Sequence, residues 1–193
     1  MCNDYGNHVA YAEYAEALRR LHMPLVAPIA APNLEPRDDI WPTEIAPVIR
    51  RMDNGAELAQ LRWGFEPLNP RGRTVINFRS DGRSFANSRR CLVPASHFYE
   101  FKGAKAPKEK WRFTLNGEPW FCFAGLWREA TDTAPESFTL LTTPPGPDVA
   151  PIHSRQMAIV RRADWQAWLD LTKSEEELLS PLGAGSLTVE RVR

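Results

Sequence analysis

Long apolar runs are missing from this chain. Hydrophobic residues make up 43% of its 193 residues, but no run approaches the roughly 20 apolar residues that a membrane-spanning helix needs. The N-terminus lacks the basic and apolar regions of a secretory signal. We therefore expect a cytoplasmic protein with no membrane partner. The length suits one domain, residues 1–193, with a sizeable core.

Cysteine is scarce, and its three copies form no metal or disulfide pattern. Cys2, Cys91 and Cys122 are widely spaced, without a CxxC pair. Cys91 and Cys122 lie in apolar, strand-like runs, which predicts buried thiols. We expect no metal and no cofactor, and Cys2 remains as the candidate reactive thiol.

A net charge is absent as well, since 24 basic residues balance 24 acidic ones. Arginine is nevertheless concentrated in residues 71–90, where the only acid is Asp81. Arginine forms forked bonds to phosphate and stacks on bases, so this stretch indicates either a nucleic-acid contact or a solvated face. Its six arginines are Arg71, Arg73, Arg79, Arg83, Arg89 and Arg90.

Regular structure is predicted to be mostly β. Residues 8–22 have the apolar spacing of an amphipathic helix that Asn7 can cap, and the proline-rich residues 24–47 are expected to be extended. Short helices are expected at 83–90, 163–170 and 174–180. Strands are expected at 46–51, 57–63, 74–78, 91–94, 97–101, 110–115, 120–127, 137–143, 156–161 and 186–192. This order predicts a single α+β domain with a β-rich core.

Cys2 combines two nucleophiles if the chain is processed. Methionine is usually removed before a small residue, so we expect Cys2 to become the first residue. Its amine and thiol have reference pKa values of about 7.7–8.0 and about 8.5. An aldehyde is then captured first as an imine and next as a thiazolidine ring. The alternative is an incidental residue on a frayed terminus.

Four polar elements lie on or beside strand-like runs, where inward-facing polar groups require partners. Each also has a structural interpretation: a hydrogen-bonded turn asparagine, an arginine-paired glutamate or a core histidine. The elements are Asn77 with Arg79, Glu100 between aromatic residues, Thr142 with Thr143, and His153 with Arg155.

Together with Cys2, these elements resemble the SOS-response-associated peptidase family, which includes abasic-site-processing proteins. The resemblance covers residues 1 to about 170. It rests on the ordered segments MCN at 1–3, RWGF at 62–65, INFRS at 76–80, RRCLVPASHFYEF at 89–101 and LLTTPPGPDVAPIHSR at 140–155.

The resemblance implies a domain of that family's fold, with a barrel-like mixed or antiparallel sheet core and peripheral helices. It also implies single-stranded DNA containing abasic sites as the partner, crosslinked through the N-terminal cysteine. Cys2, Asn77, Glu100 and His153 match the family's active-site residues. The residues expected to hold DNA are Trp63, Gly64, Arg79, Arg83, Thr142 and Arg155.

The implied roles follow from the chemistry. His153 can exchange protons at neutral pH during opening of the closed sugar. Glu100, among aromatic neighbours, is expected to have a raised pKa and to move protons during imine formation. Trp63 or Phe65 is expected to offer a face to a base. The protein is expected to be a monomer that associates with the nucleoid when bound to damaged DNA.

The chain departs from the family pattern at its N-terminus, where Asp4 replaces an arginine and is expected to repel phosphate. Ser80-Asp81 stands where the family pattern often has a glutamate just past the Asn-x-Arg motif. Ser154 replaces the usual acidic residue after the histidine. Two other functions stay open: a cysteine peptidase, with autopeptidase activity, that uses Cys2 and His153, and a non-covalent single-stranded DNA-binding module.

Overall fold

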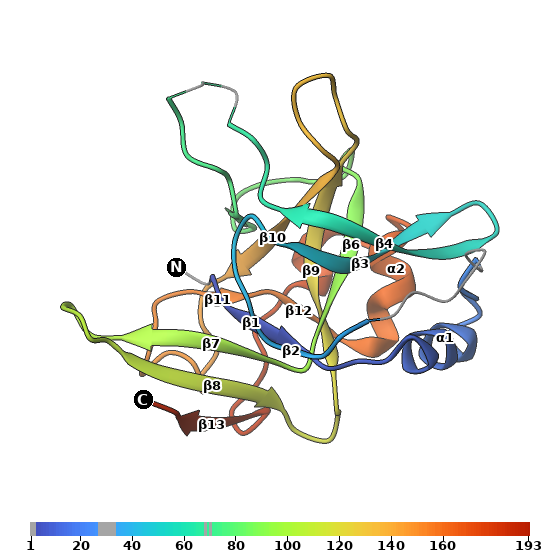
Figure 1. Ribbon diagram of the computed structural model, residues 1–193. Helices are drawn as coiled ribbons and strands as arrows, with labels where there is room; N and C mark the ends of the chain where they lie inside the picture. Colours follow the sequence, from blue (N-terminus) through green and yellow to red (C-terminus); the bar gives the residue numbers. More distant parts are fainter. Residues whose placement is uncertain (1–2, 27–33, 68, 70) are drawn as a thin grey trace.

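The computed structural model describes residues 3–26, 34–67, 69 and 71–193, and their strands form two sheets (Figure 1). The smaller sheet is antiparallel throughout and has the order β13-β8-β7-β1-β2. Its strands are β1 (Tyr5–Asn7), β2 (Arg37–Ile40), β7 (His97–Lys102), β8 (Glu109–Leu115) and β13 (Leu187–Arg191).

The larger sheet closes on itself. Strand β10 pairs with β4 on one edge and β9 on the other, and β3 and β6 complete a ring of order β10-β4-β3-β6-β9. The α+β, β-rich architecture expected from the sequence is confirmed. The strands of this sheet are β3 (Ile45–Met52), β4 (Gly55–Trp63), β5 (Asn77–Arg79), β6 (Arg90–Ala95), β9 (Phe121–Arg128), β10 (Ser137–Thr143), β11 (Gln156–Met157) and β12 (Ile159–Val160).

Strand β10 changes its neighbours along its length. Ser137 and Phe138 lie between β4 and β9, whereas Thr142 lies between β5 and β11. The pairing of β10 with β5 is parallel and begins at Leu140 opposite Asn77. The ring therefore opens toward the end of β10, and the segments that follow β4 and β10 meet there.

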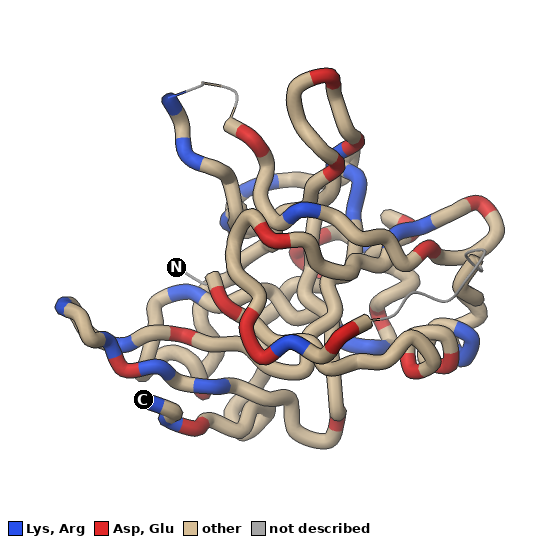
Figure 2. Tube along the Cα trace, viewed as in Figure 1, with Lys and Arg blue, Asp and Glu red and all other residues tan. Residues whose placement is uncertain are grey.

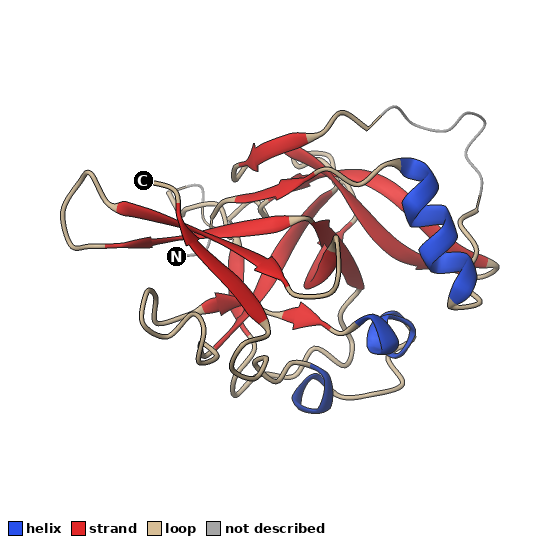
Figure 3. Cartoon of the chain, turned by 90° about the horizontal axis from the view of Figure 1, so that it is seen from below, coloured by secondary structure: helices blue, strands red, loops and turns tan. Residues whose placement is uncertain are grey.

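Two buried clusters stabilise this arrangement. One lies between the ring and the smaller sheet and includes Phe98, Phe123 and Phe138. The other packs the outside of the ring against the helices and includes Trp165 and Trp168. Figure 3 shows α1 and α2 on the side away from both chain ends. The helices are α1 (Tyr11–Arg20), α2 (Trp165–Leu169) and α3 (Glu175–Leu178), with a 3-10 turn at Arg162–Asp164.

Cys91 and Cys122 are fully buried free thiols, as predicted, and burial raises the pKa of both. None of the helices in the described residues is long and apolar enough to cross a membrane.

Several sequence expectations about local structure are wrong. Strands β1 and β2 were not predicted, and Asn7 belongs to β1 instead of capping the first helix. That helix begins at Tyr11, where the Glu13 carboxylate accepts a hydrogen bond from the Ala10 backbone at 2.9 Å. Residues 83–90 form no helix, because the Phe85 amide donates to Glu175 at 2.8 Å instead of to its own segment. Within the proline-rich stretch, residues 27–33 lie outside the described part of the chain.

Candidate active site

The structure brings Glu100 and His153 into contact from two different sheets. Glu100 lies on β7 of the smaller sheet with a side chain only 1% exposed, and His153 lies in the loop between β10 and β11. Glu100 Oε2 is 3.3 Å from His153 Nδ1. A carboxylate and an imidazole at this distance form an acid–base pair at the junction of the sheets.

Hydrogen bonding selects the form of the His153 ring. Nδ1 is 2.7 Å from the carbonyl oxygen of Arg155, which can only accept, so Nδ1 carries the proton. This bond takes precedence over the 3.3 Å approach of the Arg155 amide to the same nitrogen. Burial lowers the His153 pKa below its usual value, although the bond to the Arg155 carbonyl opposes this. The ring is therefore neutral at neutral pH, with its lone pair on Nε2.

Arg155 connects this pair to the strands at the ring opening. Its Nη2 donates to the Thr142 carbonyl at 2.6 Å and to Asp81 Oδ1 at 2.6 Å. The same carbonyl accepts from the Ser80 amide and hydroxyl. Ser80, which follows β5, is thereby tied to the end of β10 and to Arg155, and Arg155 lies two residues along the chain from His153. Asn77 is half-buried at the start of β5, where it is paired opposite Leu140 of β10.

Thr142 has a positional role in this arrangement. Its side chain is buried, and its hydroxyl donates to the Phe78 carbonyl at 3.3 Å. Gly64 is also fixed by packing: its φ is +115°, and a Cβ there would lie 2.3 Å from Thr74 Cγ2. The Thr142 hydroxyl also accepts from Arg155 Nη2 at 3.2 Å, so this side chain links β5, β10 and Arg155.

A cavity of about 720 Å³ adjoins the acid–base pair. It is bounded by the β7–β8 hairpin, the β2–β3 turn, the loop that carries His153 and the first described residue of the chain. Its lining residues are Asn3, Trp41, Phe101, Gly103, Lys108, Ile152, His153 and Ser154. Cys2 lies outside the described residues, and Asn3, its neighbour in the sequence, lines this cavity.

The expected stacking surface at Trp63 or Phe65 is contradicted by burial. Trp63 is 0% exposed, stacks on Phe138 in the core and donates its indole N–H to the Ile76 carbonyl at 3.0 Å. Phe65 is 3% exposed. Trp41 lines the cavity together with Phe101, and Trp41 is 40% exposed on the β2–β3 turn. Sequence reasoning missed it, although its place in a proline-rich turn was a signal of exposure.

The arginine-rich stretch divides into exposed and structural members. Arg90 is buried, lies 4.3 Å from the Trp168 ring centroid and pairs with Glu175 at 2.6 Å, so it belongs to the core. Arg89 pairs with Glu129. The other four arginines of residues 71–90 are exposed, and no acidic group of the described residues lies within 4.0 Å of them; they are Arg71, Arg73, Arg79 and Arg83. Basic residues also stand out along the β4–β5 loop in Figure 2.

Asp4 does not present an exposed negative charge, contrary to expectation. It is 0% exposed, and its Oδ2 lies 2.8 Å from Lys110 Nζ. Among the described residues, no group of three or more histidine, cysteine, aspartate or glutamate side chains has the arrangement of a metal site.

A ring of strands fused to an antiparallel sheet, with a glutamate–histidine pair at their junction, defines the class of protein. The chain belongs to the SOS response associated peptidase (SRAP) family, whose sequence model matches residues 1–193.

Similar proteins span most of the chain. The abasic site processing proteins YoqW and YobE of Bacillus subtilis (strain 168) are 26% and 25% identical, each over 92% of this chain and 85% and 87% of their own length. A crystal structure of a Bacteroides thetaiotaomicron protein has a TM-score of 0.78 at 20% identity, covering 100% of this chain and 92% of its own. One from Bordetella bronchiseptica has a TM-score of 0.71 at 24% identity, covering 100% of both chains. These structures show the same fold.

Proposed function

We propose that this protein binds single-stranded DNA and captures abasic sites covalently through Cys2. The observation that carries the proposal is the contact of buried Glu100 with His153 beside a cavity that Asn3 also lines. Consecutive Cα atoms are about 3.8 Å apart, so the chain leads from Asn3 directly to residue 2. Relatives named abasic site processing proteins support the substrate class.

The chemistry needs protons at defined steps. The closed sugar opens when one proton leaves the anomeric hydroxyl and another reaches the ring oxygen. The Cys2 amine then adds to the aldehyde, and loss of one water gives an imine. The thiol sulfur adds to the imine carbon while the nitrogen gains a proton, which closes the thiazolidine. Glu100 and the neutral His153 are the general acid–base groups for these transfers, and no cofactor takes part.

The surrounding residues suit a DNA strand. Arg79 and Arg83 are exposed and bind flanking phosphates, as does Arg155 after exchange of its Asp81 partner. A base can stack on the exposed ring of Trp41, whereas Trp63 is buried. Asn77 orients the reacting groups from the start of β5. A monomer of this kind would act in the cytoplasm, on the nucleoid where DNA is damaged.

Intact mass spectrometry tests this function. The purified protein is incubated with a single-stranded oligonucleotide that contains one abasic site, and with the same oligonucleotide carrying an intact base. We expect a denaturant-stable adduct only with the abasic strand, and its mass should equal the sum of the masses of protein and oligonucleotide minus one water. The free protein's mass also reports whether Met1 is removed. A fully processed, DNA-binding protein that forms no adduct would reject covalent capture.

A peptidase is the second candidate, because the family is named for peptidase activity and a neutral His153 can activate a thiol. It predicts turnover of a peptide that depends on Cys2 and His153. Reversible binding of abasic and intact strands with equal affinity, without adduct or peptide cleavage, would instead indicate a non-covalent DNA-binding module.

A further inference from the structure

A buried carboxylate lies directly after the N-terminal tripeptide. Asp4 is 0% exposed, and its Oδ2 is 2.8 Å from Lys110 Nζ. The same Nζ is 2.5 Å from Asp39 Oδ1. Buried ionisable groups are costly unless they are paired. Here one ammonium group joins two carboxylates from separate parts of the chain, and the proposed proton transfers do not use this bridge.

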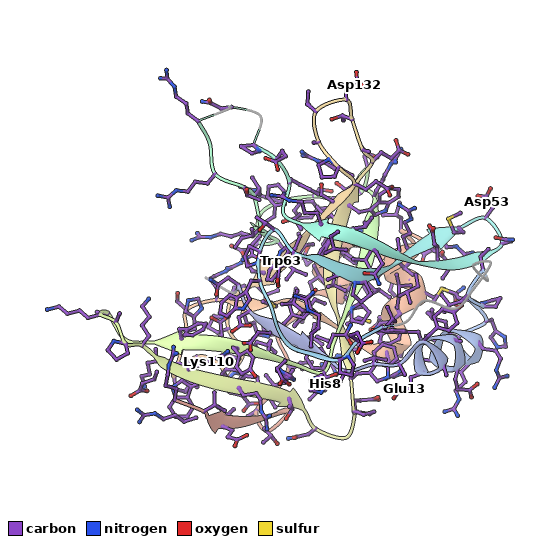
Figure 4. The ribbon with its side chains drawn as sticks, in the orientation of Figure 1. His8, Glu13, Asp53, Trp63, Lys110 and Asp132 are labelled. Atoms are coloured by element: carbon purple, nitrogen blue, oxygen red, sulfur yellow. The ribbon has the colours of Figure 1, made fainter. Side chains whose placement is uncertain are left out.

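The bridge crosses the smaller sheet from strand to strand. Lys110 lies on β8, and its Nζ passes 3.6 Å from the ring centroid of Tyr99 on the adjacent β7. It then reaches Asp4, just before β1, and Asp39 on β2. Lys110, at the left of the molecule, is labelled in Figure 4. One side chain thus spans the order β8-β7-β1-β2.

The bridge occupies the face of the sheet opposite the core. Side chains alternate along a strand, and Tyr5, Ile40 and Phe98 belong to the core cluster. Their neighbours Asp4, Asp39 and Tyr99 therefore face the other side. Glu100 in turn faces the core side, where it meets His153, so the bridge and the acid–base pair hold the same strands from opposite faces.

Backbone pairing of the N-terminal segment ends at Asp4 in the described residues. β1 pairs with β7 at Tyr5 and Gly6 and with β2 at Tyr5 and Asn7, and on its N-terminal side the Tyr99 amide donates to the Asp4 carbonyl at 3.0 Å. Chain termini fray unless something ties them down. The Asp4–Lys110 contact is the side-chain restraint nearest to the N-terminus in the described residues.

We infer that Lys110, by bridging Asp4 and Asp39, positions the N-terminal nucleophile for reaction with the aldehyde. This inference rests on the proposed function. Lys110 and Asp4 are positioning residues, since they restrain the backbone that leads to Cys2 instead of touching the reacting atoms. Restricting a nucleophile to a productive geometry lowers the barrier, and a misplacement of about 1 Å can cost on the order of 100-fold in rate.

The bridge is also sensitive to pH. Burial raises the pKa of Asp4 to about 7, although Lys110 opposes the shift and Asp39 adds to it. Other charged or titratable groups close to the bridge are Tyr99, Arg112 and His97. As pH rises through about 7, Asp4 gains its charge and attracts Lys110 more strongly. The advantage of the wild type over a variant without Lys110 should therefore grow between pH 6 and pH 8.

Single-turnover crosslinking at saturating protein tests the role of Lys110. Lys110→Met should slow adduct formation on the order of 10- to 100-fold, whereas Lys110→Arg should restore part of the rate. Non-covalent affinity, measured in a Cys2→Ser background, should stay the same. Lys173→Met is the matched control, because it makes the same change at a lysine that takes no part in the bridge and removes a pair with Asp164. It should react at the wild-type rate.

Hydrogen exchange of the Tyr99 amide separates this inference from the proposed function. Lys110→Met and Asp4→Asn should both increase exchange at Tyr99 while the core amides stay protected. Unchanged exchange would overturn the inference even if the wild type forms no adduct. Unchanged crosslinking in Lys110→Met would also overturn the inference. A loss confined to DNA affinity and its salt dependence would overturn it too, by showing that Lys110 attracts DNA instead of positioning the nucleophile. If Lys110→Met unfolds, Asp4→Asn supplies the same readouts.

Discussion

The two sheets carry different kinds of residue. The smaller sheet contributes buried groups with fixed partners: Glu100 against His153 on one face, and Asp4 against Lys110 on the other. The ring carries exposed cations in the β4–β5 loop, at Arg79 where β5 ends, and in the segment after β5. One side of the site is therefore preorganised and the other is open to solvent.

This difference matches the two tasks of the proposed function. Proton transfer benefits from groups that are buried and oriented before the substrate arrives. Phosphate binding needs flexible, exposed charges that release counterions. Substitutions on the smaller sheet should therefore change the rate of reaction at saturation, whereas substitutions on the ring side should change affinity.

The largest effect is expected from the nucleophile. Cys2→Ala and Cys2→Ser should abolish the heat-stable adduct with abasic DNA, because neither side chain can close a thiazolidine, yet both should bind single-stranded DNA as the wild type does. Denaturing gel electrophoresis and fluorescence anisotropy measure the two properties. A heat-stable adduct of Cys2→Ala formed without borohydride would contradict ring closure.

The acid–base pair should have the next largest effect. Glu100→Gln keeps the shape but removes proton exchange, and His153→Ala removes the ring; each should slow crosslinking by about 10²–10⁴-fold. The His153 variant should recover on a small open-chain aldehyde if His153 mainly opens the sugar, whereas the Glu100 variant should stay slow. Time courses on both substrates decide this. Wild-type rates in both variants would show that the pair is structural.

The pH dependence of this step follows from the His153 environment. Because burial lowers the His153 pKa, the ring stays neutral as pH falls to its usual value near 6.5 and becomes protonated only below it. The His153-dependent part of the rate, measured as wild type relative to His153→Ala, should therefore stay constant from pH 8 to about 6.5 and fall at lower pH. A fall centred above pH 7 would contradict a neutral, buried ring.

Substitutions at Trp41 test whether the DNA-binding surface extends to the β2–β3 turn. The turn that presents it is fixed, since Glu44 accepts from the Trp41 amide at 2.7 Å and pairs with Arg37 at 2.6 Å. Stacking of a base on an aromatic ring is worth about 1–3 kcal/mol. Trp41→Ala should weaken non-covalent binding accordingly, with little change in rate at saturation, and Trp41→Phe should retain much of the affinity.

The matched control for Trp41 is Met52→Ala. Met52 is 39% exposed at the end of β3, beside Asp53, which Figure 4 labels on a hairpin far from Lys110. Its loss should not affect DNA binding. Equal affinity of Trp41→Ala and Met52→Ala would remove Trp41 from the interface.

The exposed arginines should have a smaller, salt-dependent effect. Replacing Arg79 and Arg83 with glutamine should reduce the slope of log affinity against log salt by about 1.4, at roughly 0.7 per phosphate contact. The same double change at Arg19 and Arg20 of α1 is a control with equal charge. An unchanged slope for the Arg79 and Arg83 variant would show that this segment does not follow the strand.

The sequence predicted the local pattern of the fold better than its long-range contacts. Most strands were located because apolar and β-branched residues recur with a period of two. β1 and β2 were missed because they are short and contain Gly6, Asp38 and Asp39, residues with low β-propensity. Their strand conformation comes from pairing with β7 and with each other.

The site was predictable only where family motifs carried it. Glu100 and His153 were expected as active-site residues, and the structure places them in contact. Exposure was not predictable: Trp63 and Trp41 are both tryptophans near charged residues, but only packing against Phe138 decides that Trp63 is buried. The partner of Asp4 was hidden for the same reason, since Lys110 reaches it across the pairings of β8 with β7 and of β7 with β1.

The smallest effect is expected at the boundary between the two regions, where Asp81 forms an ion pair with Arg155. The bond to Arg155 lowers the Asp81 pKa, so the carboxylate is ionised at neutral pH and a phosphate must displace it to reach the guanidinium. An exposed ion pair is worth about 0.2–1 kcal/mol. Asp81→Asn should therefore raise affinity for single-stranded DNA about 1.4- to fivefold, since 1.4 kcal/mol corresponds to a factor of ten.

Asp132→Asn separates the release of Arg155 from a general change of charge. Asp132 is exposed on a distant loop, which Figure 4 labels at the top of the molecule. Anisotropy titrations at two salt concentrations should show a gain for Asp81→Asn only. A loss of affinity in Asp81→Asn would instead mean that Asp81 holds Arg155 in its working position, because the guanidinium also bonds the Thr142 carbonyl and one anchor would not be enough to orient it.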